Sequence, residues 1–264
     1  MRKVFALALL LATSLAAQRV VPNLNDGEDH GDPPYMQEEG WRPLLNGKDL
    51  SGWHGMDPKA PFGWITMQYV RWERLLGPTR LAGKPGPSGE ILNSLQGRTV
   101  NLVSDDKFGD VELYLEFMVA KGSNSGVYLN GLYEVQVFDS YGSTEPLTSS
   151  DGGGIYHRWI NEQGVGGSVP RVNACRPPGQ WQSYHIWFQA PRFDASGKKT
   201  ANAKFLRVVY NGTLVQKDVE VDGPTRAAMN IPEAPQNPLM LQGDHGPVAY
   251  RNLYIRNLRE IVDR

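Results

Sequence analysis

The segment YEVQVFDS carries residue types that proton transfer requires, and it alternates polar with apolar side chains. On an extended strand, Val135 and Val137 point to one face and suit a protein core, while Glu134 and Gln136 point to the other face. Asp139 stands five residues after Glu134, so it joins the polar face only if a bulge interrupts the strand. This face is therefore a solvated surface, a buried salt-bridge network or the floor of a binding groove.

Other segments with the same alternation add polar and aromatic side chains. In DVELYLEFMVA, Tyr114 and Glu116 alternate with a row of apolar residues, and in PLMLQGDH, Gln242 follows an apolar pair and precedes His245. Trp187 lies in YHIWFQA. If these strands belong to one sheet, their polar faces coincide with that of YEVQVFDS. Such a surface suits a carbohydrate, because polar groups satisfy the hydroxyls and aromatic rings pack on the apolar face of a sugar.

The elements that must position these residues are strands. Short runs of Val, Leu, Ile, Tyr and Phe lie between turns rich in Gly and Pro, and no long stretch has the period of an amphipathic helix. Asn211 and Gly212 separate VVY from TLV, which predicts a two-residue hairpin turn with positive φ at both positions. These features predict an all-β sandwich of two packed antiparallel sheets.

A segment of about forty residues, between Ser140 and Gln180, has no convincing strand pattern. Loops of this length in a compact domain are uncommon unless they are functional. It follows YEVQVFDS directly, so we expect it to cover the polar face. His157 lies within it and either reaches the groove or is a solvated loop histidine. A second segment, APRFDASGKKTANAKF, is expected to form a lip or hairpin extension.

The N-terminal region has the three parts of a secretory signal within residues 1–17: two basic residues, the apolar run VFALALLLA and small residues at its end. Residues 18–39 mix Pro, Gly and acidic residues and are predicted to be a flexible leader. A single domain is predicted over 40–264. The expected location is periplasmic or secreted, with no membrane association after signal cleavage.

The composition of the chain excludes some classes of binding partner and a disulfide. The formal net charge is −1, and Lys and Arg are scattered, so nucleic acid and acidic membrane surfaces are not expected partners. Cys175 is the only cysteine, so an intrachain disulfide is ruled out, and a sizeable core must stabilise the exported chain.

Several motifs together resemble one known family. They are LLNGKDLSGWHG, NSGVYL, YEVQVFDS, GQWQSYHI, YNGTLV and LQGDHGPVAYRNLYIR, and they span about residues 41–257 in order. Through these motifs the chain resembles the 3-keto-disaccharide hydrolase domain family. The resemblance implies a concanavalin A-like jelly roll, export, and hydrolysis of glycosides already oxidised at C3. Seven positions match residues typical of the family motifs: Asn124, Glu134, Gln136, Asp139, Gln242, His245 and Arg251.

The implied substrate suggests a mechanism. A C3 carbonyl acidifies the hydrogen on C2, so a base can remove it, the group on C1 can leave, and water can add afterwards. His245 is one candidate base because histidine titrates near neutral pH. Glu134 is the alternative base if burial raises the pKa of its carboxyl. Asn124 and Gln136 could donate hydrogen bonds to the enolate oxygen. A divalent cation held by Glu134, Asp139 and His245 is a further possibility.

The candidate residues fall into two groups. The catalytic candidates are Glu134, His245 and Asp139; the candidates for substrate binding are Asn124, Gln136, Gln242, Glu116, Tyr114, His157, Trp187 and Arg251. Arg251 either supports the site or forms a buried pair with a carboxylate. Glu112 is expected at the rim of the groove, where its replacement would have little effect. The alternative function is a non-catalytic carbohydrate-binding module of the same fold.

Overall fold

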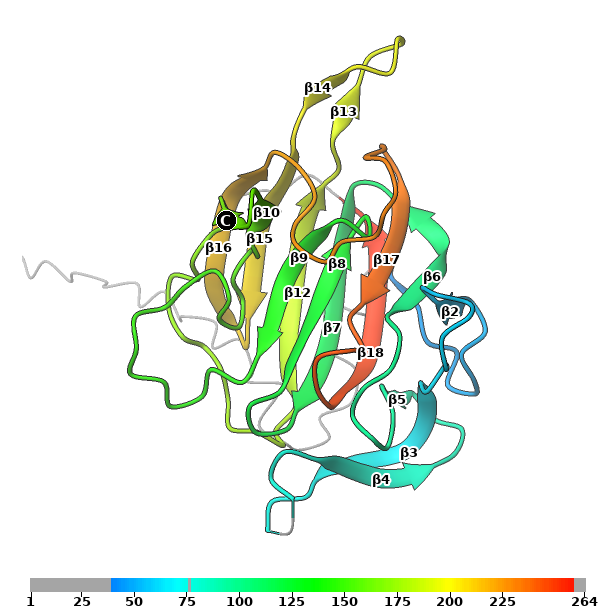
Figure 1. Ribbon diagram of the computed structural model, residues 1–264. Helices are drawn as coiled ribbons and strands as arrows, with labels where there is room; N and C mark the ends of the chain where they lie inside the picture. Colours follow the sequence, from blue (N-terminus) through cyan, green and yellow to red (C-terminus); the bar gives the residue numbers. More distant parts are fainter. Residues whose placement is uncertain (1–38, 76, 259–264) are drawn as a thin grey trace, which may run out of the picture.

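The computed structural model describes residues 39–75 and 77–258 (Figure 1). The predicted signal peptide, the predicted leader except its last residue, and the last six residues of the predicted domain lie outside the described residues. No helix able to cross a membrane occurs within the described ranges.

Two antiparallel sheets pack face to face and form the body of the protein (Figure 1). The larger sheet has the order β16 (Thr213–Val221), β15 (Ala203–Tyr210), β12 (Gln182–Gln189), β7 (Val111–Val119), β18 (Val248–Asn257), β5 (Glu90–Leu92), β3 (Ile65–Trp72) and β4 (Leu81–Pro85), with β1 (Arg42–Pro43) also paired to β18. The smaller sheet has the order β2 (Trp53–Gly55), β6 (Leu102–Phe108), β17 (Asn237–Leu241), β8 (Asn124–Leu129) and β9 (Tyr133–Phe138). The prediction of an all-β, concanavalin A-like jelly-roll sandwich of two antiparallel sheets is confirmed.

The core lies between the two sheets, where alternate residues of each strand meet. Leu113, Leu115 and Phe117 point inward from β7, and Val135 and Val137 point inward from β9. All five are fully buried. Burial of a large aliphatic or aromatic side chain contributes about 1.5–3 kcal/mol, so this layer fixes which face of each strand remains for other work.

The predicted hairpin turn is confirmed. Asn211 has φ 49° and Gly212 has φ 79°, and they join β15 to β16. Positive φ at both central residues matches the twist of the flanking strands.

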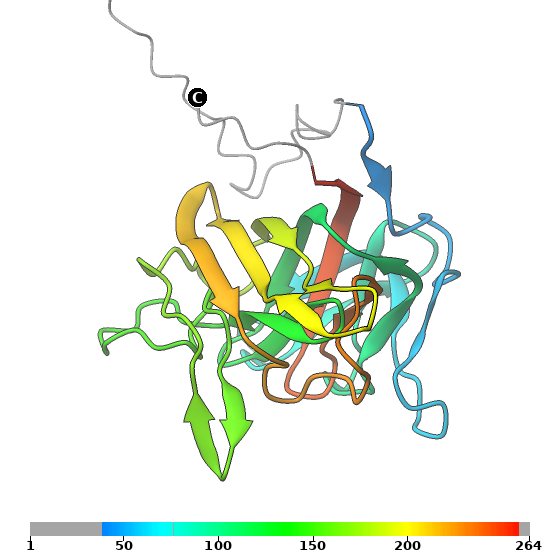
Figure 2. The same cartoon turned by 90° about the horizontal axis from the view of Figure 1, so that it is seen from above.

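The segment after β9 runs along the free edge of that strand. The backbone N–H of Gln136 donates to the carbonyl of Gly154, and that of Tyr156 donates to the carbonyl of Glu134. The chain then forms a short hairpin of β10 (Arg158–Ile160) and β11 (Gln163–Val165) that projects from the body of the molecule (Figure 2). The expected cover is therefore a side wall, with one short hairpin standing beside the outer face of the smaller sheet.

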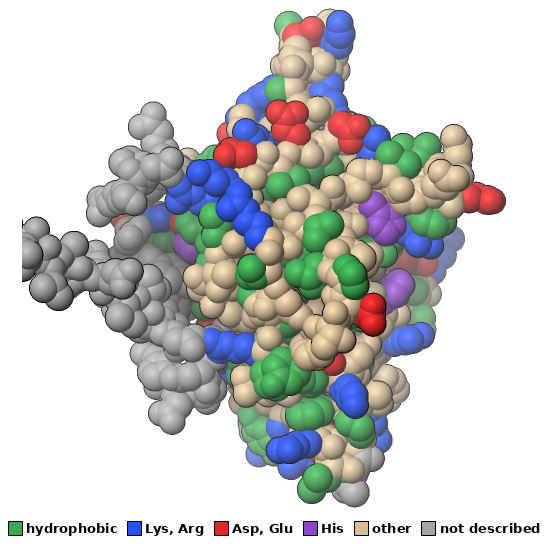
Figure 3. Space-filling model, turned by 90° about the vertical axis from the view of Figure 1, so that its left-hand side faces the viewer, with side chains coloured by type: hydrophobic (Ala, Val, Ile, Leu, Met, Phe, Trp, Pro, Cys, Tyr) green, Lys and Arg blue, Asp and Glu red, His purple; other side chains and the backbone are tan. Residues whose placement is uncertain are grey.

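A second hairpin, β13 (Arg192–Phe193) and β14 (Lys199–Ala201), projects elsewhere and corresponds to the predicted extension (Figure 1). On the face shown in Figure 3, basic, acidic and hydrophobic side chains are interspersed.

Candidate active site

A cavity of about 320 Å³ opens on the outer face of the smaller sheet. Its lining residues are Asn124, Tyr128, Glu134, Gln136, Tyr156, Arg226, Ala227, Gln242 and His245. Five of the residues expected from the sequence are thus brought together: Asn124, Glu134, Gln136, Gln242 and His245. The polar face of β9 forms the floor of a cavity.

Strand register explains this arrangement. Gly126 pairs with Gln136 and Tyr128 pairs with Glu134 across β8 and β9, so these side chains share one face. The N–H of Gln242 donates to the carbonyl of Gly126, which continues the ladder to the segment after β17. The cavity floor is therefore built on three adjacent strands, and such a support holds side chains more precisely than a loop does.

Glu134 is the buried acid of the site, with 2% of its surface exposed. Burial raises the pKa of its carboxyl to about 8; a hydrogen bond from Tyr128 lowers it, and the nearby negative charge of Asp244 raises it further. A carboxyl with this pKa exchanges protons close to neutral pH, which a general acid or base requires.

Two amide side chains on the floor have an unused acceptor. The Oε1 atoms of Gln136 and Gln242 are buried, and neither has a hydrogen-bond partner within the described part of the chain. A buried polar atom without a partner costs about 1–3 kcal/mol. Because both residues line the cavity, a ligand with hydroxyl donors is the partner that would remove this cost.

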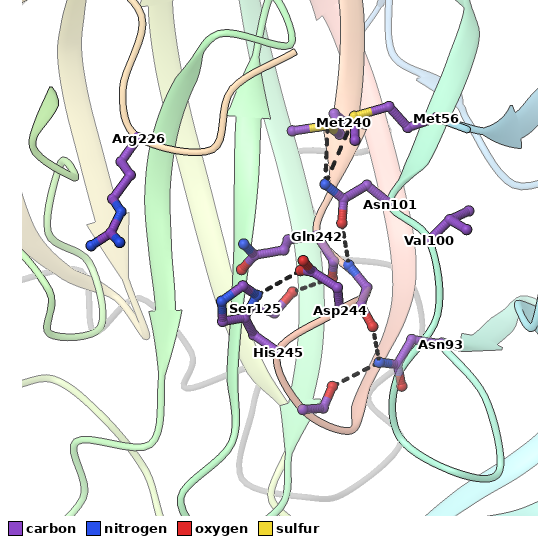
Figure 4. A network of polar contacts seen from close by, with 12 residues as sticks. Met56, Asn93, Val100, Asn101, Ser125, Arg226, Met240, Gln242, Asp244 and His245 are labelled. Atoms are coloured by element: carbon purple, nitrogen blue, oxygen red, sulfur yellow. Dashed lines mark hydrogen bonds and ion pairs between the residues drawn. The ribbon is translucent and has the colours of Figure 1, made fainter. Parts of the chain in front are cut away.

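His245 lies at the rim, about half exposed, with its Nδ1 2.6 Å from Oδ1 of Asp244. This contact orients the imidazole and occupies one of its two nitrogens. The loop that carries both residues follows β17 directly (Figure 4).

Two buried asparagines hold this loop in place (Figure 4). The Nδ2 of Asn93 lies 2.9 Å from the carbonyl of Gly243 and 2.7 Å from that of Gly246, and the N–H of Gly243 donates to Oδ1 of Asn101. Since both ends of the loop are fixed, His245 has a defined position beside the cavity.

The remaining wall includes two side chains that were not among the predicted site residues, although the segment that carries Tyr156 was expected to cover this face. Tyr156 arrives with the segment along β9, and Arg226, which Figure 4 places across the site from His245, arrives with the segment between β16 and β17. Ala227 next to it has φ 61°, a left-handed conformation that is uncommon for residues other than glycine. Strained backbone of this kind gathers at functional sites.

Comparison with known families identifies the chain. A family model described as the 3-keto-alpha-glucoside-1,2-lyase-like domain matches residues 40–256. The chain belongs to this family. The match covers most of the sequence and confirms the family resemblance of its motifs. A comparison with curated proteins gave no match.

Three solved structures from Parabacteroides distasonis ATCC 8503, all provisionally named glycosyl hydrolases, are similar to this member of the family. The first is 25% identical with a TM-score of 0.56, and the match covers 83% of this chain and 84% of that chain. The second is 20% identical with a TM-score of 0.51, covering 83% and 99%. The third is 16% identical with a TM-score of 0.51, covering 88% and 100%. The last two support the fold alone.

Four predicted binding residues lie on a different surface. Tyr114, Glu116, Trp187 and Arg251 belong to β7, β12 and β18, so they face outward from the larger sheet, on the other side of the sandwich. Nε of Arg251 lies 2.6 Å from Oε2 of Glu116, and the hydroxyl of Tyr114 donates to Oε1 of the same carboxylate. Their assignment to the groove is wrong, because β7 and β9 do not share a sheet. For Arg251 the structure shows the other predicted role, a pair with a buried carboxylate.

The same outer face contains a buried ion-pair network around Glu112. This carboxylate, 3% exposed, contacts Nε2 of His185 at 2.7 Å and Nε of Arg256 at 2.6 Å. Trp187 stacks on His185 with ring centroids 3.7 Å apart. The expectation that Glu112 lies at the rim of the groove is therefore also wrong.

Asp139 is separated from the site as well. No bulge interrupts the pairing of β8 and β9, and Asp139 lines another cavity, of about 750 Å³, together with Trp72, Lys121 and Tyr141. One of its oxygens accepts a hydrogen bond from the N–H of Gly122. The cation site imagined from Glu134, Asp139 and His245 is not assembled, and no cluster of three or more His, Cys, Asp or Glu suited to a metal occurs in the described residues.

His157 stands just outside the cavity. Its ring stacks on that of Tyr156 with centroids 4.2 Å apart, and its Nδ1 lies 3.3 Å from the hydroxyl of Ser149. Partial burial, and then the charge of Arg226, lower its pKa. His157 therefore supports the wall formed by Tyr156.

Proposed function

We propose that this protein cleaves glycosides whose sugar has already been oxidised at C3. The observation that carries the proposal is Glu134, a buried carboxyl with a pKa raised to about 8. It lies on the floor of a cavity in which Oε1 of Gln136 and of Gln242 have no hydrogen-bond partner among the described residues. Removal of a proton from a carbon next to a carbonyl needs a base of this strength, held away from bulk water.

The reaction proceeds in two stages. The ionised carboxylate of Glu134 takes the proton from C2, and the electron pair of that bond forms the enolate of the C3 ketone. The enolate collapses to a C1–C2 double bond as the C1–O bond breaks, and the leaving oxygen takes up a proton. Water then adds its oxygen to C1 and a proton to C2, so the net reaction is hydrolysis.

The other cavity residues have roles that follow from their groups. The amide nitrogens of Asn124 and Gln136 donate to the oxygen at C3, where negative charge develops. The Oε1 of Gln242, which has no partner in the described part of the chain, accepts a hydrogen bond from a sugar hydroxyl. His245, oriented by Asp244, exchanges a proton with the solvent during the second stage.

The comparisons support a carbohydrate substrate and this chemistry. The family description names a 1,2-lyase that acts on 3-keto-alpha-glucosides, and the similar solved structures carry the name glycosyl hydrolase. We extend the proposal to location: the signal expected in residues 1–17 directs the protein to the periplasm or the exterior.

The test is product analysis by mass spectrometry on matched pairs of substrates. We expect cleavage of 3-keto-trehalose and of methyl 3-keto-glucoside, and no cleavage of trehalose or methyl glucoside. In D₂O, the released 3-keto sugar should carry one deuterium at C2 at the earliest times, measured against the same sugar incubated without enzyme. Binding of these sugars without turnover would favour the non-catalytic module, and equal cleavage of the unoxidised sugars would contradict the elimination mechanism.

A further inference from the structure

Trp159 is an exposed aromatic side chain on the hairpin that stands beside the cavity. It belongs to β10, and 47% of its surface is exposed. The strand pairing of β10 and β11 places Gly164 opposite Trp159. Glycine has no side chain, so β11 does not cover the indole ring at this position. The exposed part of the indole ring is a rigid apolar surface with one polar N–H, which suits contact with a ligand that leaves the cavity mouth.

A continuous set of contacts joins this ring to the cavity wall. Tyr156 lines the cavity and stacks on His157, whose ring centroid lies 6.1 Å from that of Trp159. Arg226 also lines the cavity, and its guanidinium carbon lies 4.0 Å from the centroid of the Trp159 ring. Arg226 thus belongs to both the cavity and the hairpin surface.

Backbone contacts fix this arrangement before any ligand arrives. The N–H of Arg226 donates to the carbonyl of His157, and the N–H of Thr225 donates to the carbonyl of Leu132. At the base of the hairpin, Nη2 of Arg158 lies 2.8 Å from Oδ2 of Asp222. The loop that carries Arg226 and the hairpin that carries Trp159 are therefore tied to each other.

The size of the cavity indicates what must lie outside it. Its volume of about 320 Å³ is at the lower end of the range of about 300–1,000 Å³ seen for small-molecule sites. A cavity of this size suits the oxidised sugar, and a larger leaving group must extend past the rim. The wall at Arg226 leads directly to the Trp159 ring.

We propose that Trp159 and Arg226 form the binding platform for a leaving group that is itself a sugar. The inference rests on the proposed function, because it assigns the second half of that substrate. The apolar face of a pyranose packs on the indole ring, and the guanidinium donates to its hydroxyls. Trp159 is then a specificity-determining residue that contacts the leaving group and not the reacting carbons.

The experiment compares two substrates that differ only in the leaving group. For Trp159→Ala, we expect kcat/KM on 3-keto-trehalose to fall about tenfold, mainly through KM, and kcat/KM on methyl 3-keto-glucoside to stay within about twofold. Trp159→Phe, which keeps an aromatic ring, should retain most of the activity on the disaccharide. Tyr69→Ala is the matched control, because Tyr69 is 50% exposed on β3 of the other sheet.

Two outcomes would overturn the platform: an equal loss on both substrates, or no loss on the disaccharide. A change of oligomeric state in Trp159→Ala, measured by light scattering, would assign the ring to a contact between copies of the chain.

A binding measurement separates this inference from the proposed function. By tryptophan fluorescence titration, the wild type should bind unoxidised trehalose more tightly than methyl glucoside, and Trp159→Ala should bind them alike. Equal affinity in the wild type contradicts the platform, whereas failure to cleave any 3-keto substrate contradicts the proposed function.

Discussion

The carboxylate of Glu134 lies directly above the backbone of Gly126. A Cβ atom at Gly126 would stand 2.1 Å from Oε1 of Glu134 and 2.8 Å from Cε2 of Tyr128. Both contacts are far shorter than carbon and oxygen atoms tolerate. Glycine is required here because the acid occupies the volume of the missing side chain.

Gly126→Ala is therefore expected to displace the carboxylate and lower kcat on a 3-keto-glycoside by about 100-fold, since a misplacement of about 1 Å can cost that much. Single-turnover rates would measure the loss. Gly89→Ala is the control, because a Cβ there meets nothing within 4 Å. Wild-type activity in Gly126→Ala would mean that the position of the Glu134 carboxylate is not critical.

Glu134→Gln tests the acid itself. The amide has nearly the same shape but exchanges no proton, so kcat should fall by about 10² to 10⁴ while the far-ultraviolet circular dichroism spectrum stays unchanged. Glu220→Gln, at an exposed position of β16, is the matched control and should retain full activity. If Glu134→Gln turned over a 3-keto-glycoside at the normal rate, another group would be the base.

The pH profile separates the two roles open to Glu134. With a pKa of about 8, only about one tenth of the protein carries the ionised form at pH 7. If the carboxylate is the base, kcat/KM rises as pH increases toward about 8 and then levels off. A fall across the same range would instead show that the protonated carboxyl is needed, as a donor to the oxygen at C3.

Alternation in the sequence was sufficient to find the floor of the site. It placed Val135 and Val137 in the core and Glu134 and Gln136 on the outer face, and the structure agrees. The same period in NSGVYL, counted from Asn124, leads to Tyr128, which was not among the predicted site residues. Arg226 comes from an irregular segment whose position depends on contacts with distant residues, so no local pattern indicates it.

Alternation did not reveal which strands share a sheet. The link between β7 and β8 crosses from one sheet to the other, with a turn in which Gly122 has φ 69°. As a result, the polar faces of β7 and β9 look in opposite directions. Arg251 pairs directly with Glu116 across β18 and β7, a register that only the folded chain displays.

Glu112→Gln is expected to lower stability and leave the reaction unchanged. The buried carboxylate holds both His185 and Arg256, and its replacement leaves a charged guanidinium with a weaker partner. A loss of about 2 kcal/mol or more in the free energy of unfolding is expected, since breaking a buried pair costs several kcal/mol. Urea denaturation measures this loss. An unchanged midpoint, as expected for Glu220→Gln, would show that the network contributes little.

The raised pKa of Glu134 also makes stability depend on pH. The folded protein binds this proton up to about pH 8, whereas the unfolded chain releases it near the ordinary value of 4.5. Between these values the folded state binds more protons, so the stability from this group is complete below about pH 4.5 and is lost as pH rises through about 8.

Glu134→Gln tests this dependence because it removes the ionisable group. Its unfolding free energy should equal that of the wild type at pH 4 and exceed it by on the order of 3 kcal/mol at pH 7. Other carboxyls, such as Glu90 and Glu112, titrate alike in both proteins, so the difference between the two curves isolates Glu134. Parallel curves of unfolding free energy against pH would mean that the carboxyl of Glu134 is ionised in the folded protein at neutral pH, which would remove the basis for its assignment as a buried base.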